Sequence, residues 1–349
     1  MKDSYFHRVQ AQTATRFWIN NVTREETRLA IEAGACGCTQ NPSFPYKMLT
    51  CDDEAEKAYV LSLLDPILQQ EPDDNEAQIK LQHALVRNIA KAFLPVYQRC
   101  GGKMGFVSIQ GDPFREDADT IVQYALSNCD APNIMAKIPV TEEGLKAIRI
   151  LAKQGVAINA TEVMAVRQAI DVADAYMEAT AGMKHPPVIF YSHIAGIFDE
   201  HLVNRVKQQG TDICPDALWQ AGIAVAKKVY QVVNDKACGI GFIGGGARGL
   251  HHFTEMVGAN AVVTINWKGT AEDLILQNPP VVQRFLAPVP HGVIEELVEK
   301  LPDFRKAYFA HAIEPKEYEE YGPVVLFRSM FEDAWKKANA IIAKRRRNL

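Results

Sequence analysis

One lysine, Lys137, interrupts an apolar stretch that runs from Ile134 to Val140. A short apolar run that stops near a proline, here Pro139, is typical of a buried strand. Lysine is rarely buried without a reason, because the loss of hydration lowers the pKa of its amine. A neutral amine can attack a ketone and form a Schiff base. The alternative is a lysine that extends to solvent or pairs with a carboxylate, and this stretch alone leaves both interpretations open.

Polar residues also stand at the ends of other short apolar segments. The expected strands are residues 17–20, 35–39, 105–110, 134–139, 156–159, 187–192, 239–243 and 261–264, and their polar end residues include Asn20, Thr39, Gln110, Lys137, Asn159 and Ser192. Eight strands that alternate with helices predict a closed (β/α)8 TIM barrel, in which all these ends meet at one mouth. The rival, an open doubly wound sheet, is disfavoured because no GxGxxG follows the first strand.

The helices predicted between these strands have recognisable starts. Thr23 and Thr141 are expected N-caps, because acidic residues and a periodic apolar face follow each of them. The expected helices are residues 24–33, 52–100 in pieces broken at Pro66 and 71–75, 116–126, 142–151, 162–176, 199–209, 215–234 and 324–344. We expect one domain over residues 1–349, with 269–349 as a C-terminal helical extension. The apolar stripe of its last helix is expected to pack on the barrel or on a second copy in a homo-oligomer.

The composition excludes several classes of protein. The chain has 349 residues, 48% of them hydrophobic, and a net charge of −4, which gives no reason to expect nucleic acid or a membrane surface as a partner. Seven cysteines without a CxxC pair indicate neither a disulfide framework nor a zinc site. The sequence also lacks an apolar run of spanning length and a secretory h-region. A soluble, cytoplasmic protein without a metal or cofactor is therefore expected.

A glycine-rich segment, Gly244 to Gly249, precedes a helix that contains His251 and His252. The amides of Gly245 and Gly246 at a helix start, with the guanidinium of Arg248, predict an anion site suited to phosphate. The alternative is a tight turn with a surface arginine. A metal-dependent aldolase built on the two histidines is set aside, because adjacent residues on a helix point in different directions.

Five segments of the sequence resemble the transaldolase family, over most of the chain from Phe17 to the last helix. They are Cys38-Thr-Gln-Asn-Pro-Ser43, Ala136 to Ile148, Ile158-Asn-Ala-Thr161, Ser192 to Gly196 and Gly244-Gly-Gly-Ala-Arg248. The resemblance implies an enzyme of carbohydrate metabolism, with a Schiff-base lysine on strand four. It would cleave or transfer a dihydroxyacetone-type unit of a ketose or ketose phosphate. The residues implied as catalytic are Lys137, Asn20, Gln110 and Thr161, and those implied for substrate are Asn41, Asn159, Ser192, Arg248, Gly245 and Gly246.

The sequence departs from the family at several of these positions. The strand-one aspartate, which shuttles the proton, is Asn20 here, and an amide cannot accept a proton at neutral pH. The strand-three glutamate is Gln110, as in the fructose-6-phosphate aldolase type. A second phosphate arginine corresponds to Ile197, and a serine of the strand-seven motif corresponds to Gly246.

Asp112 and His193 are candidates for a substitute base, followed by Tyr191 and Cys38. The alternatives are that Asp112 caps a helix near Pro113 and that His193 is a polar loop residue. Two functions therefore stay open at this point: a divergent Schiff-base transaldolase or aldolase, and a sugar-binding barrel with little turnover.

Overall fold

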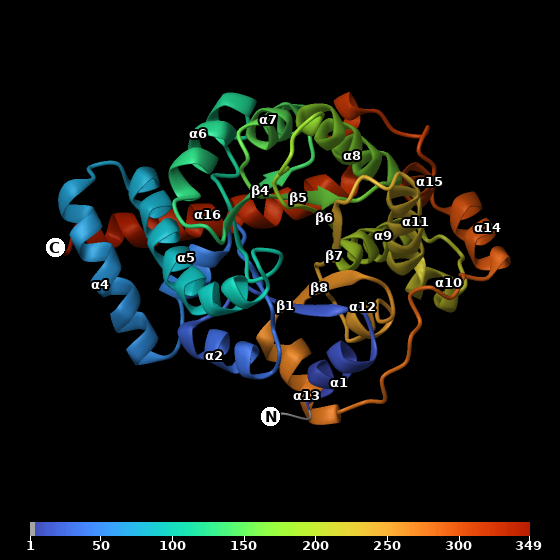
Figure 1. The fold of residues 1–349 in the computed structure, drawn as a ribbon, viewed down its shortest axis with the longest axis horizontal. Coiled ribbons are helices and arrows are strands. Elements are labelled where there is room, and N and C mark those ends of the chain that lie inside the picture. The colour runs from blue at the N-terminus through green and yellow to red at the C-terminus, as the bar shows by residue number, and fades with distance from the viewer. Residues whose placement is uncertain (1–3) are drawn as a thin grey trace.

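The computed structural model of the protein describes residues 4–349. Eight parallel strands form a closed barrel in chain order, and β8 closes on β1 through the pairing of Arg16 with Val262 (Figure 1). The strands are β1 (Arg16–Asn20), β2 (Cys38–Thr39), β3 (Val107–Gln110), β4 (Ile134–Pro139), β5 (Ile158–Val163), β6 (Ile189–His193), β7 (Gly241–Gly244) and β8 (Ala261–Ile265). The predicted (β/α)8 barrel is confirmed, and an open sheet is excluded because both edges are paired.

Helices surround this barrel, and the final helices, α14 to α16, follow its last strand (Figure 1). They are α1 (Tyr5–Gln12), α2 (Arg24–Glu32), α3 (Phe44–Leu49), α4 (Glu54–Gln70), α5 (Asp74–Arg99), α6 (Ala118–Asn128), α7 (Glu142–Lys153), α8 (Val166–Thr180), α9 (Ala195–Gln209), α10 (Pro215–Trp219), α11 (Ala221–Asp235), α12 (His251–Thr254), η1 (Trp267–Ala271), α13 (Glu272–Gln277), α14 (His291–Lys300), α15 (Pro302–Tyr308), η2 (Pro315–Glu317) and α16 (Gly322–Arg346). No helix within residues 4–349 is both long enough and apolar enough to cross a membrane.

Both predicted N-caps are confirmed. The Thr23 hydroxyl accepts from the Glu26 amide at 3.1 Å, and the Glu26 carboxylate accepts from the Thr23 amide at 2.9 Å, which is a capping box. The Thr141 hydroxyl accepts from the Gly144 amide at 3.0 Å. The second cap begins α7 directly after β4, so it fixes the exit of the strand that carries Lys137.

Several expected element boundaries are wrong, among them the helix expected from residue 199, which begins at Ala195. Pro66 lies inside α4 and does not break it, because Leu64 and Leu68 on its two sides are buried and hold the helix against the core. The helix expected to begin at Glu162 begins instead at Val166. Strand β5 continues through Glu162 because its register against β6 shifts between Ala160 and Val163, and Glu162 adopts a positive φ of 63°.

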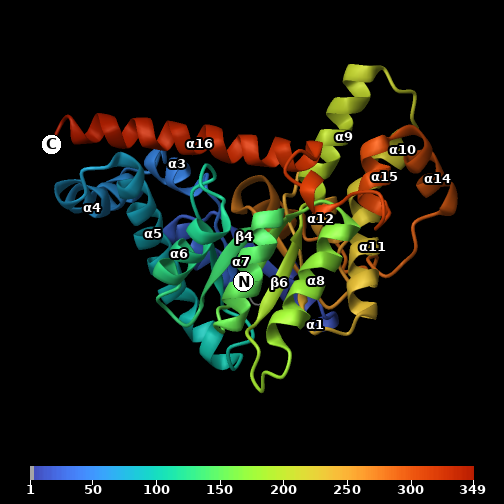
Figure 2. The same cartoon turned by 90° about the horizontal axis from the view of Figure 1, so that it is seen from above.

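The last helix, α16, runs across the mouth of the barrel (Figure 2). It contacts α3, α5 and α9, which belong to widely separated parts of the chain. Arg345 pairs with Asp65 of α4 at 2.6 Å, and Arg346 pairs with Asp74 of α5 at 2.7 Å. The expected apolar stripe of this helix therefore packs on the barrel, where it forms a roof over the strand ends.

Candidate active site

A cavity of about 210 Å³ opens between the carboxyl ends of the strands and the underside of α16. Its polar wall comes from strands and strand ends, and its apolar roof comes from α16. The lining residues used below are Asn20, Asn41, Lys137, Thr161, Ser192, Gly245, Gly246, Arg248, Asn266, Phe327, Met330 and Phe331. Of the polar strand-end residues expected to converge at the mouth, Asn20, Thr39, Lys137 and Ser192 line this cavity, whereas Gln110 and Asn159 do not.

Lys137 lies within β4, in register with Gln110 of β3 and Asn159 of β5. Its side chain is buried, and its Nζ atom lies 5.9 Å from the centre of the Phe331 ring. No carboxylate of residues 4–349 lies within ion-pair distance of this amine. Burial lowers the pKa of Lys137 to about 8, although the charge of Glu162 acts in the opposite direction. A substantial neutral fraction of the amine near pH 8 is the property that nucleophilic attack on a carbonyl requires.

Glu162 is the buried group that sequence reasoning missed. It is fully buried, and its Oε1 atom accepts a hydrogen bond from Nε2 of Gln110 at 2.9 Å. In the part of the chain that the structure describes, its Oε2 atom has no partner. Burial raises the pKa of Glu162, against the influence of Arg328, Gln110 and Lys137. A positive φ at a residue with a side chain is strained, and such strain is concentrated at functional sites.

Two further charged groups complete this cluster. Glu116, between β3 and α6, lies 3.2 Å from the guanidinium of Arg328 on α16. Burial, and then the neighbouring Glu162, hold the pKa of Glu116 well above its usual range. Arg328 follows Phe327 in the apolar stripe of the expected last helix, so its place in that helix could be predicted. No local pattern indicates where the stripe packs, so its proximity to Glu116 could not be predicted.

Asn20 and Asn41 reach the cavity, as predicted, but both side chains already have partners. The Oδ1 atom of Asn20 accepts from the Thr39 hydroxyl at 2.8 Å, and its Nδ2 atom donates to Asn266 at 2.9 Å. The Oδ1 atom of Asn41 accepts from Asn21 at 2.8 Å. Asn20 therefore presents a neutral, hydrogen-bonded amide to the cavity.

The structure separates the other predicted polar residues into two groups. Ser192 and Thr161 line the cavity, and the Thr161 hydroxyl has no partner among residues 4–349. Asn159 is fully buried and does not line the cavity: its Oδ1 atom accepts from Ser192 at 2.6 Å, and its Nδ2 atom donates to Ser108 at 3.3 Å. Asn159 can thus act on a substrate only by orienting the Ser192 hydroxyl.

The proposed substitute bases are held elsewhere. Asp112 accepts from the Phe114 amide at 2.9 Å and from Asn75 at 2.8 Å, but it does not cap a helix, because α6 begins at Ala118 and its N-cap is Asp117. His193 lies in β6 and not in a loop, with Nδ1 at 2.9 Å from the Val163 carbonyl and Nε2 at 3.2 Å from the Gly222 carbonyl. Burial lowers the pKa of His193 to about 4. Neither side chain lines the large cavity.

Tyr191 and Cys38 are no better placed for proton transfer. Both are buried. Burial raises the pKa of the Tyr191 phenol and of the Cys38 thiol, so both groups stay protonated at neutral pH. Neither is part of the cavity wall.

The glycine-rich loop differs from the expected anion site in two respects. The Gly245 amide donates to the His193 carbonyl at 2.9 Å, so it continues the sheet and is not free for an anion. Arg248 does reach the cavity, but its Nε atom lies 2.5 Å from Glu200 of α9. Any anion at this end must therefore compete with a carboxylate that is already present.

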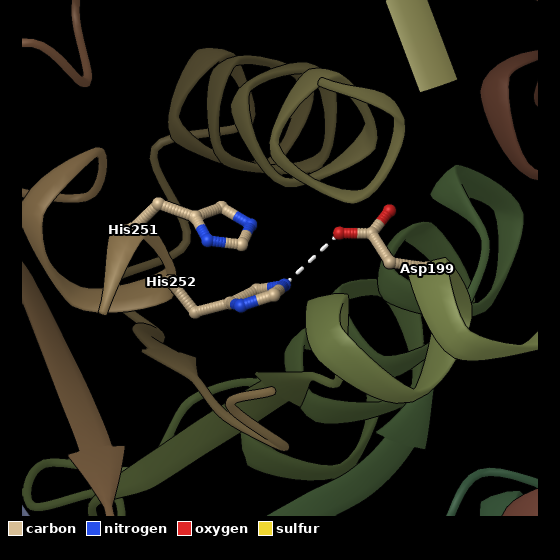
Figure 3. A group of neighbouring side chains, drawn as sticks. All are labelled: Asp199, His251 and His252. Carbon is tan, nitrogen blue, oxygen red and sulfur yellow. Dashed lines mark hydrogen bonds and ion pairs between the residues drawn. The ribbon is translucent and has the colours of Figure 1, made fainter. Parts of the chain in front are cut away.

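His251, His252 and Asp199 lie together behind this loop (Figure 3). One ligand atom of each lies within 4.8 Å of the others, so the argument that the two histidines point apart is wrong. Both nitrogens of His252 are nevertheless engaged. Nε2 lies 2.9 Å from Asp199, and Nδ1 accepts from the Arg248 amide at 3.3 Å. This arrangement supports the loop through hydrogen bonds, and a metal would have to displace them.

Comparison with known proteins adds an independent finding. Residues 17–288 match the family described as transaldolase/fructose-6-phosphate aldolase. A transaldolase of Mycobacterium ulcerans is 30% identical over 233 residues, which cover 61% of this chain and 60% of the relative. A transaldolase of Thiobacillus denitrificans is 27% identical over 252 residues, covering 66% and 68%, and one of Neisseria meningitidis serogroup A is 27% identical over 229 residues, covering 62% of each. The match thus spans about 60% of the length of the mycobacterial relative.

Proposed function

The chain belongs to the transaldolase/fructose-6-phosphate aldolase family, and from this premise we propose that it cleaves or transfers a dihydroxyacetone-type unit of a ketose through a Schiff base on Lys137. The observation that carries this proposal is the state of Lys137. Its amine is buried at a polar cavity, has no carboxylate within ion-pair distance among residues 4–349, and has a pKa lowered to about 8.

The chemistry follows from this amine. Neutral Lys137 adds to the ketone, and the carbinolamine loses water to leave an iminium. The iminium withdraws electrons, so the adjacent carbon–carbon bond breaks once a base removes the hydroxyl proton of the departing aldehyde. The resulting enamine then attacks a second aldehyde, which is transfer, or takes up a proton, which is cleavage.

The cavity wall is suited to a polyhydroxylated substrate. Thr161, Ser192 and Asn20 offer hydroxyl and amide groups around Lys137. Phe331 and Met330 of α16 cover the opposite side, and an apolar roof limits the access of water to the enamine. Arg248, paired with Glu200, is the cation at the far end and would face a terminal phosphate.

Trapping with borohydride tests the proposal. Borohydride added with fructose 6-phosphate or dihydroxyacetone should fix a mass increment on the peptide that contains Lys137, and Lys137→Met should abolish it. Lys227 provides a matched control, since burial also lowers its pKa and it donates to the carbonyls of Arg284 and Ala287 away from the mouth. Lys227→Met should leave the increment unchanged. Labelling of another lysine, or none with a panel of ketoses, would contradict the proposal.

A sugar-binding barrel with little turnover is the second candidate, and the neutral amide of Asn20 favours it. A binder can still form the Schiff base, so trapping alone does not separate the two functions. Release of an aldehyde from a ketose, or its exchange between two acceptors, should be followed on the same samples. Trapping with release supports the enzyme, and trapping without release supports the binder.

A further inference from the structure

We propose that Glu162 is the proton reservoir of the Schiff-base site. Its carboxyl group supplies the proton with which the carbinolamine hydroxyl leaves, and the resulting carboxylate balances the charge of the iminium. This inference rests on the proposed Schiff base at Lys137 and deepens it. It assigns a role to a position outside the residues that carry the family resemblance, and it addresses the proton chemistry that Asn20 cannot perform.

The position of Glu162 is the first argument. In a regular strand, Thr161 and Glu162 would point to opposite faces. The register shift of β5 and the positive φ of Glu162 instead bring its carboxyl group to Gln110. Glu162 directly follows Thr161, which lines the cavity. The Oε2 atom is buried and has no partner among residues 4–349. Such a carboxyl oxygen is costly to leave unpaired unless it exchanges a proton or binds a polar group.

A small second cavity is the next argument. It has a volume of about 30 Å³ and is lined by Gln110, Glu116 and Lys137, among others, so Lys137 borders both this cavity and the large one. This volume is sufficient for one water molecule. The wall of this cavity thus includes Lys137 and Gln110, the residue that donates a hydrogen bond to Glu162.

The charged groups near Glu162 come from β4, from α16 and from the segment before α6. They are Lys137 on β4, Glu116 before α6 and Arg328 on α16, while Glu319 lies 3.9 Å from Arg328 at the edge of the group. Arg328 balances one of the two buried carboxylates, Glu116 or Glu162. When Lys137 is neutral, nothing balances the second, so one proton must reside on the pair.

The proposed step preserves the buried charge. Before reaction, Arg328 is charged, Glu116 and Glu162 share one proton and one negative charge, and Lys137 is neutral. Lys137 adds to the ketone, the proton of Glu162 joins the carbinolamine hydroxyl, and the carbon–oxygen bond breaks to release water. Arg328, Glu116 and Glu162 are then charged beside the cationic iminium. The sum is zero in both states, which is favourable where water is excluded. Hydrolysis returns the proton to Glu162.

The test is the pH dependence of Schiff-base formation, measured as the rate of trapping by cyanoborohydride with dihydroxyacetone. Glu162→Gln keeps the volume and removes the proton, so the rate at neutral pH should fall by about 10²-fold, within the range of general acid–base catalysis. The pKa of Lys137 read from the profile should also fall, because the carboxylate that raises it is gone. Glu162→Asp should restore part of the rate.

The control removes another buried carboxylate. Glu56 is buried and pairs with Arg24 at 2.8 Å, away from the mouth, so Glu56→Gln should leave the pH profile unchanged. If Glu162→Gln does not fold, Arg328→Gln serves in its place. Arg328 lowers the pKa of both carboxyl groups, so its removal should move the carboxyl-dependent limb of the profile to higher pH.

The outcomes separate this inference from the proposed function. If the wild type is trapped at Lys137 and the trapping rate of Glu162→Gln equals that of the wild type at every pH, the proposed role of Glu162 is wrong. The proposed Schiff base at Lys137 is then unaffected. A pH profile of trapping that is the same in Arg328→Gln as in the wild type would also contradict the proposed role of Glu162. If the wild type is not trapped at all, the proposed function itself fails.

Discussion

The two halves of the barrel mouth use their buried polar groups in opposite ways. In the lysine half, formed by Gln110, Lys137, Thr161 and Glu162 on β3 to β5, three residues carry a buried oxygen without a partner in the described chain. In the histidine half, formed by His193, Asp199, Arg248 and His252 on and after β6, the buried side chains are all hydrogen-bonded.

This difference distinguishes chemistry from support. A buried polar group without a partner costs stability, so a protein retains it where a substrate or a proton will supply the missing partner. A saturated network stabilises and fixes the backbone that it holds. The histidine half thus positions the loop of Arg248, whereas the lysine half keeps buried polar atoms available to a ligand. Substitutions in the two halves should therefore affect stability with opposite signs.

Asp199→Ala should produce the largest change, a loss of about 3–5 kcal/mol in the free energy of unfolding. Asp199 accepts from the Gly222 amide at 2.6 Å and pairs with His252, and both donors would be left buried without an acceptor. Urea unfolding measures the loss. Asp174→Ala removes an exposed pair with Lys236 and should cost less than about 1 kcal/mol. Similar losses for the two variants would remove the contrast between the halves.

Lys137→Met should raise the free energy of unfolding by up to about 3 kcal/mol at pH 7, since a pKa unit corresponds to about 1.4 kcal/mol. The pKa of Lys137 falls from 10.5 to about 8 on folding. Below pH 8 the wild type bears the whole cost of the buried charge. Between pH 8 and 10.5 the unfolded chain binds the extra proton, so wild-type stability rises with pH.

The gain of Lys137→Met over the wild type should consequently disappear as the pH approaches 10.5. Unfolding of both proteins at pH 7 and pH 10 checks this, because other titrating groups cancel in the difference. A variant that is less stable than the wild type at pH 7 would show that Lys137 is a structural residue.

Asn20→Asp should increase turnover of a ketose phosphate by about 10²-fold, the lower range for an added general base. Asn20 already lines the cavity, and the amide of Asn266 can turn to donate to the new carboxylate. Steady-state aldehyde release measures the gain. Asn266→Asp places the same charge in the same cavity, on the hydrogen-bond partner of Asn20, and should increase turnover little. Equal effects of the two variants would indicate a general effect of charge.

Glu200→Gln should have the smallest effect, a tightening of phosphate binding by up to about fivefold, because a half-exposed ion pair contributes about 1 kcal/mol or less. Removing the carboxylate frees the guanidinium of Arg248 for an anion. The Michaelis constant should fall for a ketose phosphate and stay constant for the unphosphorylated ketose. No difference between the two substrates would place the phosphate elsewhere.

Local patterns were sufficient for most of the fold. Thr23 and Thr141 could be identified as caps from a few neighbouring residues, and Lys137 from the apolar run around it. Glu162 was misassigned because Thr-Glu after an apolar strand also resembles a helix start, with a capping threonine and an acid in the first turn. The register shift against β6, a contact between strands, determined the outcome. Such a shift has no signature within β5 itself.

The chemical environment of Lys137 could be predicted only in part. Thr161 and Ser192 follow strands, and parallel strands of a barrel share one mouth. Arg328 and Phe331 come from a helix whose destination is fixed by long-range packing on α3, α5 and α9. The sequence suggested that the Gly245 amide is free to bind an anion, because a glycine-rich turn does not reveal that its first residues continue the sheet.

The roof formed by α16 has a consequence for the order in which the molecule is built. Lys137 is placed by β4 in the middle of the chain, whereas Arg328 and Phe331, which cover it, are synthesised near the end. Synthesis proceeds from the amino terminus, so β4 is made before α16. Only when α16 docks is the amine desolvated. The burial that lowers the pKa of Lys137 is therefore complete only after α16 has been synthesised.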